Sequence, residues 1–494
     1  MDTASVTGRV AGPLGKGVQG AWIELVDTDR NTRLKTLTND AGLYIFPSVR
    51  PGHYRMQVSA LGYKTVELKS LSIYTRADIQ QNFALVRGVP EDSVILASSG
   101  TPIQTNGAVS TVVEQQLVNE LPLNGRSFQT LFQLVPGVTI TPTTFASQGQ
   151  ISVNGQRTDT NDFVVDGVSA NFAVAAGVNP GQSAGGWLPA LTVFGGTNSL
   201  VSTEAVQEFA VLTSSYSAEF GRVPGAQISI VTRSGTNTVR GSLFEYLRND
   251  AFDANDWFAN NKGLKRAALR QNDFGGVLGG PIIKNKTFFF ASLEALQLRQ
   301  PTSSSTAVPS LMARNSAPAP VKPFLNAYPL PNGPAEGNGL AQATYGFSNP
   351  SSLEALSFRV DHHFRESLDT FVRFAYSTSD SQQRAAGSDA SSTVTDTRFG
   401  LKTLTGGIAY SISQGILNDF RFNWSRSSAD SKEELDSFGG AIPLGQQLVF
   451  PPGFNAQTSL FQFSPAFVQQ VPELELGQKV ENSQTQVNLV DDVS

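Results

Sequence analysis

Apolar and polar residues alternate with a period of two along four strand-length runs between residues 355 and 426. In the clearest run, Phe420, Phe422 and Trp424 alternate with Arg421 and Asn423. A period of two places one set of side chains on each face of a sheet. A strand with one apolar and one charged face is typical either of a half-buried soluble sheet or of a membrane barrel with a wet lumen.

The connections between strands help to separate these two interpretations. We predict eight strands in residues 236–494, at about 238–248, 270–279, 287–296, 355–364, 369–378, 398–412, 417–426 and 480–491. The connections between them are alternately short and long, which is the layout of an outer-membrane barrel, whereas long structureless loops are uncommon in a compact soluble domain. The pattern therefore favours a partial barrel whose apolar face meets lipid. Its lumen-facing positions would include Arg359, Asp361, Arg373, Arg421 and Asn423.

Composition narrows the range of functions further. Charged residues make up 16 % of the 494 residues, against about 25 % in a typical soluble domain, and the net charge is −5. The absence of a basic excess argues against nucleic acid as a partner. With three histidines and no cysteine we expect no metal site and no cofactor. No nucleophile elbow, phosphate loop or HExxH motif is present, so we expect no enzyme.

The two ends of the chain lead to a further expectation. No apolar run reaches the roughly 18–20 residues of a membrane-spanning helix. The first residues have neither the basic nor the apolar region of a signal peptide, and residues 487–494 end within a strand-like pattern. We therefore expect a fragment of a longer protein, without its signal peptide and most of its barrel.

Residues 1–86 predict a small all-β domain. Seven short β-rich runs are separated by Gly, Pro and Asn-Asp turn signals, which is the spacing of a β-sandwich. The segment resembles the carboxypeptidase regulatory-like domain, an accessory module without a peptidase site. The resemblance rests on Gly8-Arg9-Val10, Val18–Ala21, Thr38–Tyr44, Pro51–Tyr54 and Leu61-Gly62-Tyr63.

We predict that residues 87–98 form a linker that ends in a short apolar segment. An acidic hinge that contains Pro90 is followed by the short apolar segment Val94, Ile95, Leu96 and Ala97. Such a strand is suited to β-augmentation, in which its backbone pairs with the sheet edge of a partner.

Residues 99–235 predict a mixed α/β domain. We expect helices over Val112–Leu121 and Ser127–Leu134, since each ends at or before a proline. We expect strands at Ile151–Val153, Phe163–Val165 and Ile228–Thr232.

The same segment resembles the plug domain of TonB-dependent outer-membrane receptors, in particular the Oar-like branch. The motif positions are Asn124, Gly125, Arg126, Asn154, Gly155, Arg157, Asp166, Gly167, Gly221, Arg222 and Arg233. The resemblance implies a receptor in the outer membrane of a Gram-negative-type envelope, with a plug inside a barrel of about 22 strands. The plug positions Arg126, Arg157, Arg222 and Arg233 are candidates for pairing with acidic lumen residues, but for each one taken singly we favour a solvated or structural charge.

The resemblance further implies a function and a partner. Val94–Ala97 would stand where the TonB box lies, and a periplasmic TonB-type protein would energise the uptake or export of a bulky solute. The solute would bind on the long-loop side. The alternative from another class is a surface adhesion or carbohydrate-binding scaffold that uses the sandwich and the loops without transport.

Overall fold

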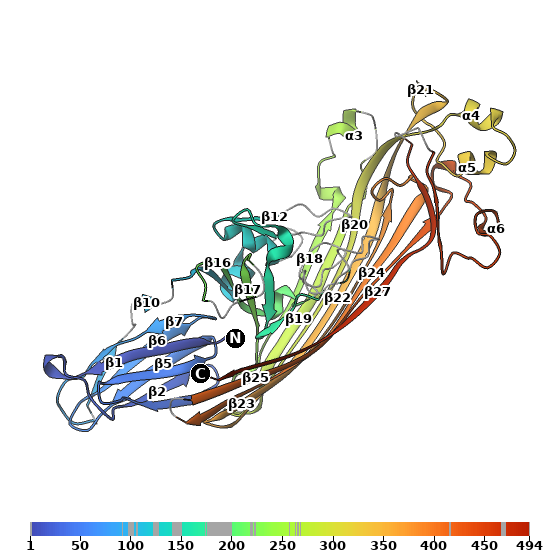
Figure 1. Cartoon of the computed structure of the whole chain (residues 1–494). Coiled ribbons are helices and arrows are strands. Elements are labelled where there is room, and N and C mark those ends of the chain that lie inside the picture. The colour runs from blue at the N-terminus through green and yellow to red at the C-terminus, as the bar shows by residue number, and fades with distance from the viewer. Residues whose placement is uncertain are drawn as a thin grey trace.

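The structure, a computed structural model, describes residues 2–493 except 91, 97–102, 105–106, 122–127, 141–150, 173, 175–199, 218–220, 222–223, 256, 262, 264–265, 267, 414–415 and 466–470. Figure 1 shows three parts: a β-sandwich, a small mixed α/β unit and a long curved sheet. The sandwich lies at one end of the long sheet, and the mixed unit, called the central unit below, lies against one face. The predicted fold class, mainly β with these three parts, is confirmed.

The sandwich consists of two five-stranded sheets around an apolar core that includes Ile23, Leu25, Met56 and Leu68. The first sheet contains β1 (Ala4–Ala11), β4 (Leu43–Val49), β7 (Asp78–Gln80), β8 (Phe83–Ala84) and β10 (Ile103–Gln104). The second contains β2 (Trp22–Asp27), β3 (Arg33–Leu37), β5 (Gly52–Ser59), β6 (Thr65–Ile73) and β9 (Ser93–Leu96). The seventh predicted strand is interrupted and forms β7 and β8.

Two of these strands lie after residue 86, where the sequence predicts a linker. β9 runs parallel to β6, with Val94 opposite Val66, and β10 runs antiparallel to β7. Val94 packs against the sandwich core, whereas Ile95 is 53 % exposed. The segment that follows the predicted domain thus extends both sheets of the sandwich.

The central unit is a sheet in the order β11 (Val109–Glu114), β16 (Val206–Ser214), β17 (Gln227–Thr232), β14 (Asp162–Val165) and β15 (Val168–Ser169). A second hairpin joins β12 (Val138–Ile140) to β13 (Ile151–Val153). The helices are α1 (Gln115–Glu120) and the 3-10 segments η3 (Phe128–Leu134), η4 (Thr158–Thr160) and η5 (Thr203–Ala205).

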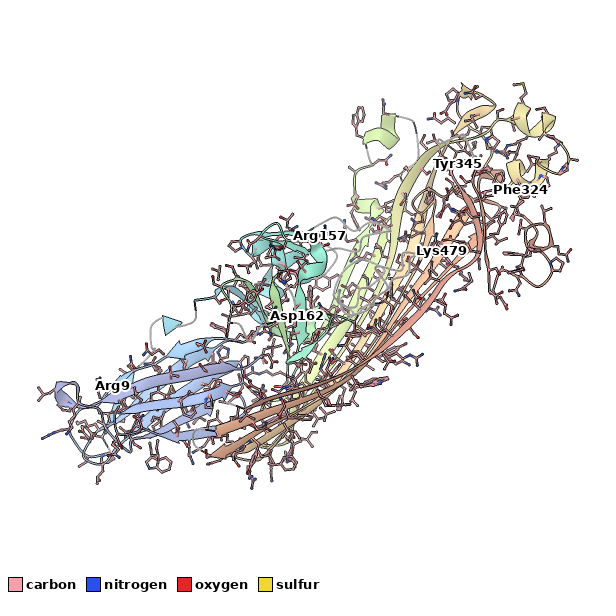
Figure 2. All side chains as sticks on the ribbon, viewed as in Figure 1. Arg9, Arg157, Asp162, Phe324, Tyr345 and Lys479 are labelled. Atoms are coloured by element: carbon pink, nitrogen blue, oxygen red, sulfur yellow. The ribbon has the colours of Figure 1, made fainter. Side chains whose placement is uncertain are left out.

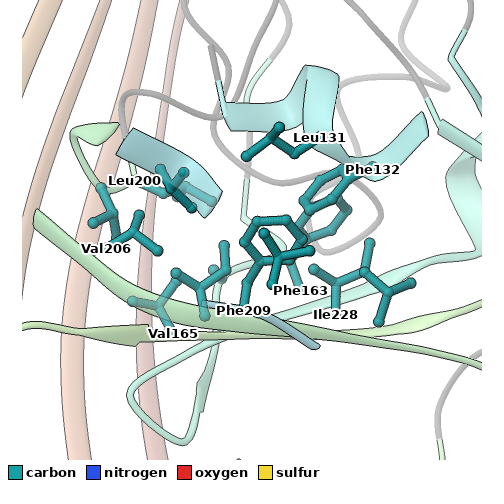
Figure 3. Close-up of a cluster of buried hydrophobic side chains, with 14 of the residues drawn as sticks. Leu131, Phe132, Phe163, Val165, Leu200, Val206, Phe209 and Ile228 are labelled. Carbon is teal, nitrogen blue, oxygen red and sulfur yellow. The ribbon is translucent and has the colours of Figure 1, made fainter. Parts of the chain in front are cut away.

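The core of the central unit fixes these elements relative to one another. Phe132 of η3 packs edge-on against Phe209 of β16, with ring centroids 4.9 Å apart, and both side chains are buried beside Phe163 and Ile228 (Figure 3). The predicted helix over 112–121 is wrong in its first three residues, because Val112–Glu114 pair with β16. Two consecutive valines favour the strand, and the helix begins only at Gln115.

The long sheet contains the eight predicted strands in sequence order. They are β18 (Arg240–Asn249), β19 (Arg270–Ile283), β20 (Thr287–Pro309), β22 (Leu340–Arg365), β23 (Leu368–Arg384), β24 (Thr393–Ser413), β25 (Ile416–Leu435) and β27 (Leu474–Val493). Two short strands, β21 (Ala335–Gly337) and β26 (Leu460–Phe463), pair with β22 and β27. β18 and β26 lie at the two ends of the strand order, so the sheet is open. In the described part of the chain, no helix is long and apolar enough to cross a membrane.

The register of the long sheet sorts its side chains into apolar and polar rows. One row runs across five strands through Phe358, Phe374, Leu404, Trp424 and Val487. Its members are partly exposed; Phe358, for example, is 46 % exposed. The adjacent row, on the opposite face, is polar and turned toward the central unit. It contains Arg359, Arg373, Thr405, Asn423 and Asn488, and the first four of these are buried.

The two ends of the long sheet differ. The short turns lie beside the sandwich, where Lys35 of β3 contacts Glu366 of the β22–β23 turn at 2.9 Å. The long connections gather at the other end (Figure 1). They contain η6 (Asp250–Phe252), η7 (Phe438–Gly440), α3 (Trp257–Asn261), α4 (Leu311–Ser316), α5 (Lys322–Asn326) and α6 (Gln446–Val449).

The long connections are packed against one another. Tyr328 is completely buried and donates a hydrogen bond from its hydroxyl to the carbonyl of Pro472 at 2.8 Å. Arg314 is buried and donates to the carbonyls of Pro309, Tyr328 and Pro329. This end of the sheet is therefore a folded cap rather than a set of separate loops.

Candidate functional site

The central unit presents one carboxylate to the long sheet through a tight turn. Asp166 and Gly167 connect β14 to β15, and both have positive φ, 48° and 83°. Asp-Gly is the sequence that a two-residue type I′ turn favours. A Cβ at Gly167 would lie 3.0 Å from Asp2 and 3.2 Å from Arg421, so the glycine also allows the close approach.

Asp166 is buried and surrounded by donors. Its carboxylate accepts from the Thr232 backbone N–H at 3.0 Å and from the Thr232 hydroxyl. It forms ion pairs with Arg359 of β22 at 3.1 Å and with Arg373 of β23 at 2.9 Å. Burial alone would raise the pKa of Asp166, but the two guanidinium groups and Thr232 outweigh it and hold the pKa below its usual range. The acid is therefore charged, and it joins the central unit to two strands of the sheet.

Arg359 extends this cluster to the sandwich. Its guanidinium group binds both carboxylate oxygens of Asp361 at 2.9 Å and lies over the ring of Phe371, 4.3 Å from the centroid. Asp361 also pairs with Arg50 of the sandwich at 3.0 Å. The three parts of the molecule thus meet in one chain of charges, which runs from the buried Asp166, Arg359 and Asp361 to the partly exposed Arg50.

The remaining polar positions of β25 lie on the same face. Arg421 pairs with Asp419 at 2.8 Å and lies 4.0 Å from Asp2, close to Gly167. Asn423 accepts from Asn488 at 3.2 Å and donates to Thr405 at 2.9 Å. Since Asn488 also donates to the carbonyl of Ser169 in β15, at 3.4 Å, the hydrogen bonds of β25 reach the central unit.

The other predicted site residues of the central unit lie apart from the Asp166 cluster or outside the described residues. Asn154 and Gly155 form a turn with positive φ, and Arg157 and Gly221 are exposed. Arg233 donates to the carbonyl of Glu204 at 3.0 Å and lies over Phe290 of β20, 4.9 Å from the ring centroid. In the ion pairs between the described residues of the central unit and the sheet, the central unit thus supplies the acid and the sheet supplies the arginines. Asn124, Gly125, Arg126, Arg222 and Ala97 lie outside the described residues.

The sandwich and the central unit also contact each other directly, through residues that the sequence analysis did not identify. Glu208 of β16 is buried and accepts from the Thr75 backbone N–H at 2.5 Å, and Tyr74 donates to Glu114 of β11 at 2.7 Å. Burial raises the pKa of Glu208 to about 8; the Thr75 hydrogen bond opposes this, and nearby Glu114 and Asp2 add to it. The contact therefore contains a carboxyl group that is protonated at neutral pH.

We expect this contact to weaken as the pH rises. The folded-state pKa of Glu208 lies above its ordinary value of 4.5, so the stabilisation is complete below about pH 4.5 and is lost as the pH approaches 8. At about 1.4 kcal/mol for each pKa unit, the loss between pH 5 and 8 is on the order of 4 kcal/mol.

The Glu208→Gln variant keeps a hydrogen-bond acceptor and removes the titration. Its thermal midpoint in detergent should therefore fall less between pH 5 and pH 8 than that of the unchanged chain. Glu481→Gln, at an exposed position of β27, is the matched control and should retain the full pH dependence. Equal pH dependence in all three proteins would show that Glu208 does not titrate as described.

The fold and the site define a class of protein: an outer-membrane β-barrel wall with a separate unit held on its polar face. The sequence matches the Outer membrane beta barrel domain family over residues 231–321 and 313–494, more than half of the chain. It also matches the Carboxypeptidase regulatory-like domain over residues 5–86 and the TonB-dependent Receptor Plug Domain over residues 101–226. The chain belongs to the outer-membrane β-barrel family of TonB-dependent receptors, and its place is the outer membrane.

The chain is also similar to individual outer-membrane transporters and receptors. The chain is 28 % identical over 271 residues to the TonB-dependent transporter Oar of Myxococcus xanthus. The matched region covers 52 % of this chain and 23 % of the transporter. Similar solved structures include the outer membrane transporter YddB from Escherichia coli, with 12 % identity, a TM-score of 0.49, and coverage of 78 % of this chain and 45 % of the other. The siderophore receptor PirA from Acinetobacter baumannii shares 14 % identity over 66 % of this chain and 48 % of its own, with a TM-score of 0.33.

The chain thus spans less than a quarter of the curated relative and about half of these solved structures. The family consists of receptors rather than enzymes, which confirms the expectation that the chain is not an enzyme. The central unit is called the plug below.

Proposed function

We propose that the protein to which this chain belongs moves a bulky solute across the outer membrane, by uptake or export, with energy supplied by a periplasmic TonB-type protein. The observation that carries the proposal is the attachment of the plug to the wall through the buried pairs of Asp166 with Arg359 and Arg373. Polar interfaces between units permit relative motion more readily than apolar ones, because both surfaces can be hydrated once they separate. Apolar contacts from Val277, Phe290 and Leu401 of the wall also reach the plug core, but a charged anchor beside polar wall residues suits a plug that moves.

The coupling protein would act through the strand β9. In a parallel pair, alternate residues direct their N–H and C=O groups to the same neighbour. Thr65 donates to the carbonyl of Asp92 and lies opposite Ser93, so Asp92, Val94 and Leu96 bond toward β6. Ser93 and Ile95 then direct their backbone groups to the outer edge, because β9 ends the order of its sheet. This edge is where a strand of the partner would add.

The sandwich connects this edge to the anchor of the plug. β9 is hydrogen-bonded to β6, and the same domain carries Arg50, which pairs with Asp361 beside Arg359. A pull on β9 would therefore be transmitted through the sandwich to the charge cluster that holds Asp166. We propose this as the mechanical route from the coupling protein to the plug.

Two proline substitutions separate the roles of the two edges of β9. Ile95→Pro removes an N–H from the outer edge, where proline is tolerated, and should decrease capture of the periplasmic domain of a TonB-type protein at least tenfold. Val94→Pro removes an N–H that bonds to β6, so it should release β9 from the sandwich and leave its backbone available to the partner. The measurement is pull-down of the coupling domain with the chain in detergent.

Ile95→Val serves as the matched control, because it alters the side chain and keeps the backbone donor. Unchanged capture by Ile95→Pro would exclude the outer edge of β9 as the coupling site. A surface scaffold without transport would capture no coupling domain in any of these forms.

A further inference from the structure

Three acidic side chains meet in the cap formed by the long connections. Asp389 lies in the connection between β23 and β24, and Glu473 and Glu475 lie where the chain enters β27. One carboxylate oxygen from each lies within 4.8 Å of the other two. Backbone hydrogen bonds hold the two segments side by side, from Glu473 to the Ser388 carbonyl at 2.9 Å and from Ala390 to the Glu473 carbonyl at 2.8 Å.

Negative charge is in excess around this point. Glu433 of β25 joins the cluster, and Lys479 binds Glu433 at 2.9 Å and Glu475 at 2.8 Å. Figure 2 places Lys479 on the part of the long sheet nearest the cap. Lys479 thus pairs with two of four neighbouring carboxylates, whereas Asp389 and Glu473 form no ion pair in the described part of the chain. Oε2 of Glu473 accepts from the Gln462 side-chain amide at 2.6 Å, which fixes the orientation of this carboxylate.

Asp389 itself lacks the partner that a buried carboxylate requires. The residue is 5 % exposed, and in the described part of the chain its Oδ2 atom is buried without a hydrogen-bond partner. Buried charged groups are normally paired, hydrogen-bonded or bound to a metal ion. The carboxylate of Asp389 lies beside those of Glu473 and Glu475, which are also acids. A cation bound from solution would compensate the repulsion between these three groups.

We propose that Asp389, Glu473 and Glu475 form a binding site for a calcium ion. Hard divalent cations take oxygen ligands, and Ca²⁺ binds them at about 2.3–2.6 Å in flexible geometry. One oxygen from each of the three side chains lies within 4.8 Å of the others, which is close enough for all three to bind one Ca²⁺. Mg²⁺ keeps several of its waters and is usually bound through one or two carboxylates. A site that offers three carboxylates therefore favours calcium.

The ion would join two connections of the cap. The segment around Asp389 precedes β24, and the segment around Glu473 ends the long excursion between β25 and β27. Beside them lies the apolar cluster of the cap, which includes Ala390, Leu474 and Tyr328. Calcium at this site would thus fix the long excursion against the wall and order the surface that faces away from the sandwich.

The proposal is tested by isothermal titration of the chelator-treated chain in detergent with calcium chloride. We expect one Ca²⁺ for each chain, and Asp389→Asn, which keeps the size of the side chain, should weaken binding at least tenfold. Glu481→Gln removes one charge from the same strand, β27, at an exposed position and should bind as the unchanged chain does. Calcium should also slow proteolysis of the 436–473 connection, and this protection should be lost in Asp389→Asn.

Either of two results would overturn the proposal: absence of saturable binding by the unchanged chain up to about 1 mM calcium, the weak end of extracellular calcium sites, or unchanged binding by Asp389→Asn. If Asp389→Asn does not fold, Glu473→Gln decides, because Glu473 is only partly buried. Weakened binding by Glu473→Gln supports the site, and unchanged binding refutes it.

Discussion

Replacing Asp166 by alanine is expected to loosen the plug from the barrel wall by about 3–5 kcal/mol. The substitution leaves the buried Arg373 without the carboxylate that pairs with it, whereas Arg359 loses one of its two carboxylates and keeps Asp361. It also removes the acceptor for the backbone N–H and the hydroxyl of Thr232. Uncompensated buried charge is among the most destabilising changes that a single substitution can make. Hydrogen–deuterium exchange should report it as faster exchange in β14 and β17, by two orders of magnitude or more.

A second ion pair in the same sheet provides the control for this prediction. Asp380 of β23 pairs with Arg398 of β24, but the Arg398 side chain is 71 % exposed. Exposed pairs contribute about 0–1 kcal/mol, so Asp380→Ala should leave the exchange of the plug unchanged. If Asp166→Ala and Asp380→Ala had the same effect, the Asp166 cluster would not be the anchor of the plug.

Replacing Phe374 by arginine is expected to destabilise the wall by about 2–4 kcal/mol in a bilayer. Phe374 lies in the apolar row of the long sheet, between Phe358 and Leu404. If this row meets lipid, the guanidinium group must leave water, and the cost is largest near the bilayer midplane. The measurement is the urea midpoint of the chain reconstituted in lipid vesicles.

The size of this effect separates a membrane wall from a soluble sheet. In water, Phe374 would be a 40 % exposed aromatic side chain, and arginine at such a position would change stability by no more than about 0.5 kcal/mol. Phe374→Leu keeps the position apolar and should be tolerated in lipid. A Phe374→Arg variant as stable in vesicles as Phe374→Leu would contradict the lipid contact.

The sequence was sufficient to predict the strands of the wall because their signal is local. The alternation of Phe420, Phe422 and Trp424 with Arg421 and Asn423 is visible in five consecutive residues, and it places the two sets on opposite faces in any register. The ends of the strands were less visible. β20 and β22 continue through stretches rich in Ser, Thr and Asn, such as residues 300–306, where strand pairing rather than apolar alternation extends the sheet.

The contacts that make the site depend on distant segments and could not be derived from spacing. Asp166 and Gly167 stand out as a turn motif, but nothing near them in the sequence indicates Arg359 or Arg373. The strand β9 was expected in a linker, because its parallel pairing with β6 depends on the fold of the sandwich. The same holds for Asp389, Glu473 and Glu475, which come from two segments more than 80 residues apart and match no local metal-binding motif.

We expect the apolar face of the long sheet to meet lipid while its polar face holds the plug. Because the chain contains no cysteine, a single cysteine introduced by substitution can carry one spin label at a chosen position. The collision rates of each label with oxygen and with a water-soluble nickel reagent can then be compared in vesicles. Labels at Phe374 and Phe422 should collide with oxygen and be protected from nickel, and labels at Thr405 and Ser425, buried on the other face, should be protected from both. Labels at Phe374 and Phe422 that collide with nickel as freely as a label at the exposed Leu448 of α6 would contradict lipid contact of the apolar face.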